Sequence, residues 1–151
     1  MSEPEFRMKP IGIIHTPFKD QAGMPIQFSR SAAAGAIEVF SEYEAGLEGI
    51  EGFSHVILIY VFHRALDSRE LSVQPFLDDK SHGIFATRFY RRPNPLGFSV
   101  VRLVGRTGPR LQVEWVDMLD GTPLLDIKPY VPEFDVHPVE KLGWYATRAH
   151  P

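Results

Sequence analysis

The sequence predicts a mainly all-β protein, a single antiparallel β-barrel with one short helix. Short runs rich in β-branched and aromatic residues recur along the chain, turn residues separate them, and a single stretch shows helical periodicity. The 151 residues include 13 prolines and 12 glycines, which is typical of many short strands joined by turns. No internal repeat or low-complexity linker divides the chain, so we expect one domain.

The predicted strands differ in how deeply we expect them to be buried. The run SHVILIYVF is nearly continuous in apolar residues and predicts a strand buried on both faces. Pro75 makes LSVQPFL an edge candidate, because proline donates no hydrogen bond to a neighbouring strand. The strand candidates span residues 9–14, 36–40, 54–62, 71–77, 83–89, 98–106, 110–118 and 124–131.

One helix is predicted directly after the second strand candidate. Ser41 and Glu44 have the spacing of a capping box at a helix start. Tyr43, Leu47 and Ile50 follow at helical spacing and would share one apolar face. Two glycines in the same stretch weaken the helix, so we expect only one or two turns.

Composition excludes several classes of protein. The formal net charge of −3 argues against a surface coated in positive charge, and the absence of cysteine excludes disulfides and thiolate chemistry. The histidines lack zinc-site spacing, and no phosphate-binding GxxxxGK[ST] motif occurs. The polar N-terminus shows no signal peptide, and the longest apolar run, 56–62, is too short to span a bilayer. We expect a cytoplasmic protein with no membrane partner and no metal.

The stretch ATRFYRRPNPLGFSV, residues 86–100, is both basic and stiff. Pro93 and Pro95 each fix a backbone dihedral and restrict the residue before them. Arg88, Arg91 and Arg92 carry planar guanidinium groups that suit bidentate contacts with carboxylate or phosphate. The pattern predicts either an ordered anion-binding loop or a rigid crossover between strands whose arginines are solvated.

A second stretch, DMLDGTPLLDIKPY, places carboxylates among apolar residues at 117–130. Asp120 and Gly121 form a strong turn signal. An acidic turn near a basic loop would suit a zwitterionic ligand. The alternative is a plain β-turn in which the aspartate bonds to its own backbone.

Long co-linear motifs resemble one known family. They are GIFATRFYRRPNPLGFSVVRL at 83–103 and DMLDGTPLLDIKPY at 117–130, preceded in order by IGIIHTPF, PIQ at 25–27 and FSHVILIYVFHRA at 53–65. Together these resemble the TrmO (TsaA-like) family, in a short form without the C-terminal domain of longer bacterial members. The resemblance covers residues 8–135 as a TsaA-like β-barrel domain. It leaves 136–151 as a C-terminal tail, which we expect Trp144 and Tyr145 to pack in place.

The resemblance implies a β-barrel that forms a homodimer and binds S-adenosyl-L-methionine without a Rossmann fold. It implies methylation at N6 of N6-threonylcarbamoyladenosine, the modified base next to the anticodon of tRNA, so tRNA is the expected partner. We therefore expect an S-adenosylmethionine-dependent tRNA methyltransferase. Alignment of nucleophile, methyl group and sulfur supplies most of the catalysis in such a transfer, because the leaving group is neutral.

The same resemblance assigns site residues. Arg88 would pair with the methionine carboxylate or with the threonyl carboxylate of the substrate, and His63 and Asp120 compete as the catalytic base. Arg91, Arg92 and Asn94 are the expected substrate contacts. The expected cofactor contacts are Pro25, Gln27, His63, Arg64, Arg88, Phe98, Met118, Leu119, Asp120 and Gly121.

Two departures from the family pattern leave other functions open. Phe89 and Tyr90 stand where the family usually has a serine after ATR, and Ile26 replaces an arginine between Pro25 and Gln27. The bulk of Phe89 and Tyr90 favours a methyltransferase acting on a small amide or carboxylate metabolite, whereas the cluster of arginines favours tRNA. A third alternative is a non-catalytic module that binds S-adenosylmethionine or a partner protein.

Overall fold

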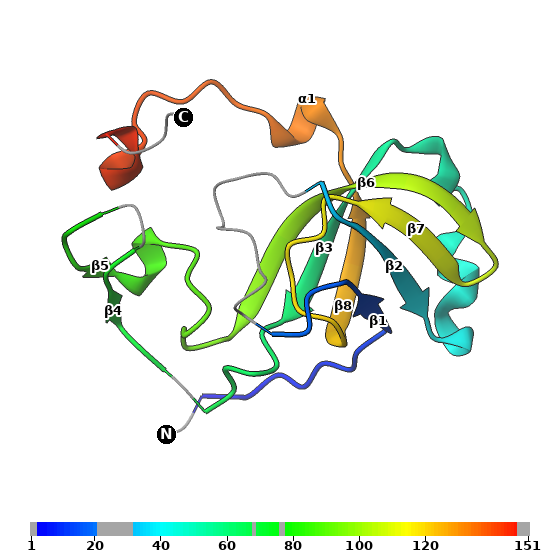
Figure 1. Cartoon of the computed structure of the whole chain (residues 1–151), viewed down its shortest axis with the longest axis horizontal. Coiled ribbons are helices and arrows are strands. Elements are labelled where there is room, and N and C mark those ends of the chain that lie inside the picture. The colour runs from blue at the N-terminus through cyan, green and yellow to red at the C-terminus, as the bar shows by residue number, and fades with distance from the viewer. Residues whose placement is uncertain (1–2, 21–31, 68, 76–77, 148–151) are drawn as a thin grey trace.

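Six antiparallel strands close into a barrel in the order β1-β2-β7-β6-β3-β8, which confirms the predicted fold class (Figure 1). The computed structural model describes residues 3–20, 32–67, 69–75 and 78–147. The barrel strands are β1 (Gly12–His15), β2 (Ala34–Val39), β3 (His55–Val61), β6 (Leu96–Thr107), β7 (Arg110–Glu114) and β8 (Thr122–Pro129).

The long strand β6 connects two halves of the barrel. It pairs with β3 from Leu96 to Arg102 and with β7 from Arg102 to Thr107. A bulge between Leu103 and Gly105 shifts the register on the β7 side. The predicted turn between β6 and β7 is present, with Gly108 in the left-handed region at φ 58°. One strand thus reaches from the hairpin tip to the opposite end of the barrel.

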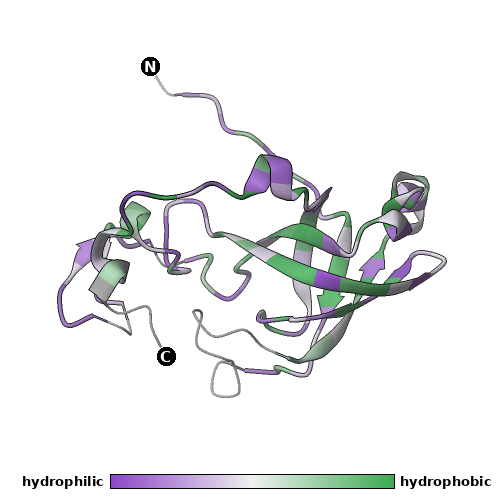
Figure 2. Cartoon of the chain, turned by 90° about the horizontal axis from the view of Figure 1, so that it is seen from above, coloured by the Kyte–Doolittle hydropathy of each residue, from purple (hydrophilic) through white to green (hydrophobic). Residues whose placement is uncertain are grey.

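The interior of the barrel is filled by the inward side chains of all six strands. Ile14, Ile37, Leu58, Val101 and Leu124 are each fully buried and come from different strands. Strand β3 is covered most completely, as its apolar run predicts. Figure 2 shows hydrophobic residues concentrated along the barrel strands. Burial of apolar surface in this single core is the main stabilising contribution to the fold.

The predicted capping box is wrong. The stretch after β2 forms two 3-10 segments, η2 (Ser41–Leu47) and η3 (Ile50–Gly52). Phe40, not Ser41, is the N-cap residue of η2, and no side chain caps that end. The chain enters the turn directly from the sheet, because the Phe40 amide still donates to the Ile11 carbonyl. Gly49, at φ 89°, separates the two segments.

The predicted strand over 83–89 is also wrong. A second, two-stranded sheet pairs β4 (Ser72–Val73) with β5 (His82–Gly83), after which the chain turns into η4 (Ile84–Ala86). The Ile84 side chain is buried, and its carbonyl accepts hydrogen bonds from the Thr87 amide and hydroxyl. These bonds close a turn where the apolar pattern alone favours an extended chain.

Strand β7 ends earlier than predicted, at Glu114 rather than 118. Trp115 adopts φ 77°, which a strand does not accommodate. The amides of Trp115 and Val116 both point back to the Ala33 carbonyl, at 2.9 and 3.2 Å. The chain therefore leaves the sheet and crosses the end of the barrel before β8 begins.

The C-terminal segment returns to the small sheet. The only α-helix in the described residues, α1 (Pro132–Asp135), and the 3-10 segment η5 (Gly143–Thr147) follow β8 (Figure 1). The Trp144 indole donates to the Ala86 carbonyl at 2.7 Å and stacks on His82. Tyr145 packs edge-on against Trp144. Within the described part of the chain, no helix is both long enough and apolar enough to cross a membrane.

Candidate functional site

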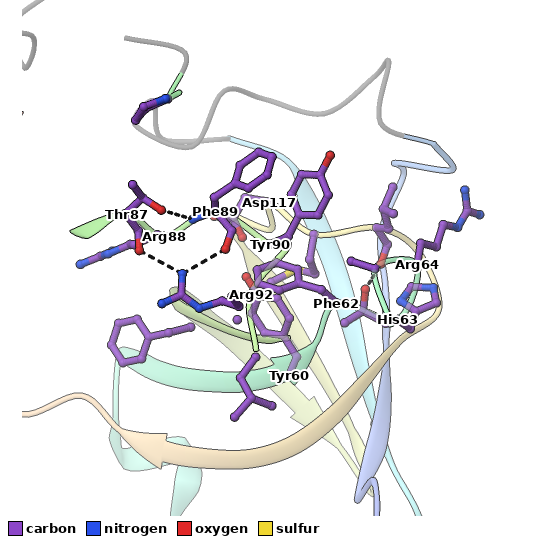
Figure 3. Close-up of a pocket in the computed structure, with 18 of the residues that line it drawn as sticks. Tyr60, Phe62, His63, Arg64, Thr87, Arg88, Phe89, Tyr90, Arg92 and Asp117 are labelled. Carbon is purple, nitrogen blue, oxygen red and sulfur yellow. Dashed lines mark hydrogen bonds between the residues drawn. The ribbon is translucent and has the colours of Figure 1, made fainter. Parts of the chain in front are cut away.

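A cavity of about 630 Å³ opens at one end of the barrel. The ends of β3 and β6 form one part of its wall, the link between β7 and β8 another, and the segment 84–92 faces them (Figure 3). This volume lies in the range of small-molecule and cofactor sites. Apolar and aromatic side chains make up much of the lining, and the lining residues that carry polar or charged groups are Tyr60, His63, Arg64, Thr87, Arg88, Tyr90, Arg92, Asp117, Thr122 and Trp144.

The segment opposite the barrel is held by its own hydrogen bonds. Arg92 donates through Nη1 to the carbonyls of Thr87, at 2.9 Å, and Phe89, at 3.0 Å (Figure 3). The Phe89 amide in turn donates to the Thr87 hydroxyl. Arg88 lies between the two carbonyls that Arg92 binds, so the Arg92 guanidinium fixes the backbone that carries Arg88.

Arg88 brings positive charge to the cavity wall. Its guanidinium lies over the Phe98 ring, with Cζ 5.9 Å from the ring centroid. The contact joins the segment 84–92 to β6 across the cavity and is a cation–π geometry. His63 and Arg64, at the end of β3, lie on the other side of the site (Figure 3). Planar guanidinium groups therefore reach the cavity from two sides.

A chain of hydrogen bonds runs from the barrel interior to the cavity. The Tyr60 hydroxyl lies 2.8 Å from the Ser99 hydroxyl, which donates to Asp117 Oδ1 at 2.8 Å. Because Ser99 has one hydrogen and gives it to the carboxylate, Tyr60 donates to Ser99. Gly97 permits this arrangement, since a Cβ at that position would lie 2.2 Å from the Tyr60 ring.

Burial shifts the ionisation of the groups in this chain. Burial raises the pKa of Asp117 above the usual carboxyl value, and the Ser99 hydrogen bond opposes that rise. Burial also raises the pKa of Tyr60, with the nearby Asp117 charge adding to the effect, so Tyr60 stays a neutral donor. The pKa of His63 is lowered by burial and by the neighbouring Arg64. Near neutral pH, His63 is an uncharged imidazole.

Asp120 has a different environment from Asp117. Its Oδ2 accepts from Lys19 Nζ at 2.7 Å, and its Oδ1 accepts from the Thr16 amide at 2.9 Å. The Lys19 hydrogen bond, followed by the Thr16 amide, lowers the pKa of Asp120. Gly121 forms the predicted turn, at φ 83°. The Asp120 carboxylate thus joins the turn before β8 to the chain after β1.

The structure brings most of the predicted site residues to the cavity but not all. His63, Arg64, Arg88, Arg92, Phe98, Met118 and Leu119 line it. Arg91, Asn94, Asp120 and Gly121 are not among the lining residues. Pro25 and Gln27, with Ile26 between them, lie outside the described residues.

Sequence reasoning did not assign Tyr60, Ser99, Asp117 or Trp144 to the site. A signal for Ser99 was available, because every second residue of β6 from Gly97 points inward and Ser99 is a polar residue among apolar ones. Trp144 is far from the motifs in sequence, and only the fold places it at the cavity. No group of three or more His, Asp or Glu side chains in the described part of the chain could hold a metal ion.

Comparisons with known proteins show which family the sequence matches and which solved structures share the fold. The profile of the family described as the tRNA-methyltransferase O N-terminal domain matches residues 13–136. A crystal structure of TrmO superposes with a TM-score of 0.78 at 41% identity, over 93% of this chain and 64% of that one. This chain therefore spans about two thirds of the solved TrmO chain.

Two curated relatives illustrate the similarity. A probable S-adenosyl-L-methionine-binding protein of Pyrococcus abyssi is 55% identical over 143 residues, which are 94% of this chain and 77% of the relative. A tRNA (adenine(37)-N6)-methyltransferase of Mus musculus is 36% identical over 134 residues, 84% of this chain and 31% of the relative. The similarity thus extends across most of the described barrel.

The hydrogen bonds of Arg92 predict a local effect of its removal. We expect Arg92→Ala to increase amide hydrogen exchange over residues 84–92, because two carbonyl contacts to a charged donor are lost, at about 1.5–3 kcal/mol each. Arg91→Ala is the matched control, since the exposed Arg91 contacts the Tyr90 ring. Equal exchange in both variants would show that Arg92 does not hold this segment.

Proposed function

Because the chain belongs to the tRNA-methyltransferase O N-terminal domain family, we propose that it is an S-adenosylmethionine-dependent methyltransferase. The proposed substrate is N6-threonylcarbamoyladenosine beside the anticodon of tRNA, which receives a methyl group at N6. The observation that carries the proposal is the cavity, where the family motifs at the end of β3, in the segment 84–92 and before β8 converge.

The residues lining the cavity fit the chemical groups of S-adenosylmethionine. Arg88 and Arg64 can hold the methionine carboxylate, and Phe98 with the apolar Met118 and Leu119 can contact the adenine ring. When bound, S-adenosylmethionine supplies an electrophilic methyl group on a sulfonium. The proposed contacts from Pro25, Gln27, Asp120 and Gly121 complete the predicted cofactor set.

Support for tRNA comes from the distribution of basic groups. Arg88 and Arg91 are exposed beside the cavity, and with Asn94 they are proposed to contact the substrate. Arg102 and Arg106 form ion pairs with Glu114 and Glu51, so much of the apparent cluster is already neutralised. The basic surface that remains around Arg88 and Arg91 is small. A dimer would present two copies of it to the tRNA. A tRNA substrate also implies that the protein acts in the cytoplasm.

A specific observation favours the alternative of a small acceptor. Phe89 and Tyr90 both line the cavity, with ring centroids 4.3 Å apart, and Tyr90 also packs against Phe62. This aromatic cluster occupies space where the family usually has a serine, which would favour a small amide or carboxylate metabolite. A non-catalytic module would bind S-adenosylmethionine and transfer nothing.

A homodimer is part of the proposal. The outer face of β6 exposes Leu96, Phe98 and Val104, with exposed fractions of 39%, 51% and 56%. Arg102, paired with Glu114, lies on the same face between Phe98 and Val104. Exposed apolar side chains gathered on one face are a common feature of protein interfaces. Since Phe98 also lines the cavity, an interface on this face would lie next to the cofactor site.

Calorimetric titration with S-adenosylmethionine tests the cofactor site. We expect micromolar binding to the wild-type protein and a loss of roughly ten- to a hundredfold in Arg88→Ala, because a charge-assisted contact to the carboxylate is removed. Arg102→Ala is the matched control, since Arg102 is paired with Glu114 on the surface. If Arg88→Ala bound S-adenosylmethionine with wild-type affinity, Arg88 would not be the residue that holds the methionine carboxylate.

Methyl transfer tests the substrate. Incubation with labelled S-adenosylmethionine should yield N6-methylated threonylcarbamoyladenosine in tRNA that carries this modification and nothing in tRNA that lacks it. Incorporation into small metabolites alone would support the second candidate. Binding with no transfer to either class would support the non-catalytic module.

Sedimentation velocity tests the homodimer. We expect a dimer at micromolar concentration, shifted toward monomer by Val104→Asp, because a charge on the exposed apolar face of β6 would be buried without a partner. Val136→Asp, which adds the same charge at a similarly exposed valine after α1, serves as the control for altered net charge. A purely monomeric wild-type protein would contradict the dimer.

A further inference from the structure

We propose that Asp117 is the catalytic base that accepts the proton of the nitrogen being methylated. This inference rests on the proposed methyltransferase function and names the residue that completes it. Among the described residues lining the cavity, Asp117 is the only carboxylate. Neither of the bases suggested by the sequence has the same combination of position and environment.

The position of the Asp117 carboxylate is fixed from behind. The Ser99 hydroxyl donates to Oδ1, and the Tyr60 hydroxyl donates to Ser99, each at 2.8 Å. Tyr60 and Ser99 are buried, with exposed fractions of 4% and 6%. They belong to the paired strands β3 and β6, so the barrel itself orients the carboxylate. A base held in this way is already positioned, so the reaction does not carry the entropic cost of ordering it.

The other ionisable groups at the cavity are less suited to accept a proton. Arg64, Arg88 and Arg92 are permanently charged donors, and Tyr60 is a neutral donor whose hydrogen already points to Ser99. The pKa of His63 is lowered by burial and by Arg64, which makes the imidazole a weaker base. Asp120 is engaged by Lys19 and the Thr16 amide outside the cavity lining.

The environment of Asp117 suits this role. Burial raises the pKa of the Asp117 carboxyl, and a weaker conjugate acid means that the carboxylate is a stronger base. The Ser99 hydrogen bond and the charge of Arg88 oppose this rise, because both favour the anion. The raised pKa makes the carboxylate more basic than that of an exposed aspartate.

The proposed step balances in atoms, electrons and charge. Asp117 accepts the hydrogen of the N6 nitrogen as a proton. The electron pair of that N–H bond remains on nitrogen, and a nitrogen electron pair forms the new bond to the methyl carbon. The pair of the broken carbon–sulfur bond stays on sulfur. The reactants are one sulfonium cation and one carboxylate anion, and the products are a neutral thioether, a neutral carboxylic acid and the methylated nitrogen.

The decisive variant is Asp117→Asn, which keeps the shape and the acceptor for Ser99 but cannot take up the proton. We expect kcat to fall by about 10²–10⁴-fold, with the affinity for S-adenosylmethionine changed by less than about tenfold. Asp126→Asn is the matched control, because Asp126 is paired with Lys128 and does not line the cavity. Asp117→Glu, which restores a carboxylate, should recover part of the lost rate.

A second variant separates catalysis from structure. Wild-type kcat should rise with pH through the pKa of Asp117 and then level off. Ser99→Ala removes the bond that lowers this pKa, so the rise should move to higher pH. The same shift should appear without any cofactor, as a higher midpoint for the Asp117 carboxyl signal in a ¹³C NMR titration, assigned by its absence in Asp117→Asn. If the role of Asp117 were purely structural, Ser99→Ala would still move the NMR midpoint but would leave the midpoint of the kcat profile unchanged.

The outcomes distinguish this inference from the proposed function. Methyl transfer by wild type that is matched by Asp117→Asn would overturn Asp117 as the base and leave the function intact. A variant that loses affinity for S-adenosylmethionine but keeps its affinity for the neutral S-adenosylhomocysteine would show that Asp117 balances the sulfonium charge, and would also overturn it. No methyl transfer by the wild-type protein to tRNA or metabolites would overturn the proposed function and this inference together.

Discussion

The pairing of β1 with β8 closes the barrel, and the arrangement of the site depends on this closure. The Ile11 amide donates to the Leu124 carbonyl at 2.7 Å, and Gly12 pairs with Leu124 across the seam. On its other side, β1 lies so close to β2 that a Cβ at Gly12 would lie 2.2 Å from the Glu38 carbonyl oxygen. Once the seam is closed, the link between β7 and β8 must cross the barrel end, where it meets β3 and β6.

That crossing explains why two carboxylates three positions apart behave differently. Asp117 is directed into the barrel end, where two buried hydroxyls organise it and burial favours its protonated form. Asp120 lies past the crossing, where a lysine and a backbone amide stabilise its charged form. One short acidic stretch thereby supplies a reactive group to the cavity and a structural contact to the seam.

The opposite wall of the cavity is organised by side chains rather than by a strand. Arg92 binds the carbonyls on either side of Arg88, and Trp144 binds the Ala86 carbonyl from far along the chain. The prolines at 93 and 95 restrict the chain that leads into β6, as their rigid rings require. The basic character of this segment therefore serves two purposes: one arginine orders the loop while another reaches the cavity.

The sequence by itself determined the barrel class, the six barrel strands to within a few residues and the family. Runs of β-branched and aromatic residues, the turn residues between them and long motifs are local properties of the chain. The sequence failed at the capping box after Phe40 and at Trp115, where backbone bonds to distant carbonyls override local preference. It also failed in the turn at 84–87, which the Thr87 amide and hydroxyl close by donating to the Ile84 carbonyl. It also named Asp120 as a candidate base and did not assign Asp117 to the site. Only the tertiary structure decided which of them is buried beside Tyr60 and Ser99, since their environments come from strands far apart in sequence.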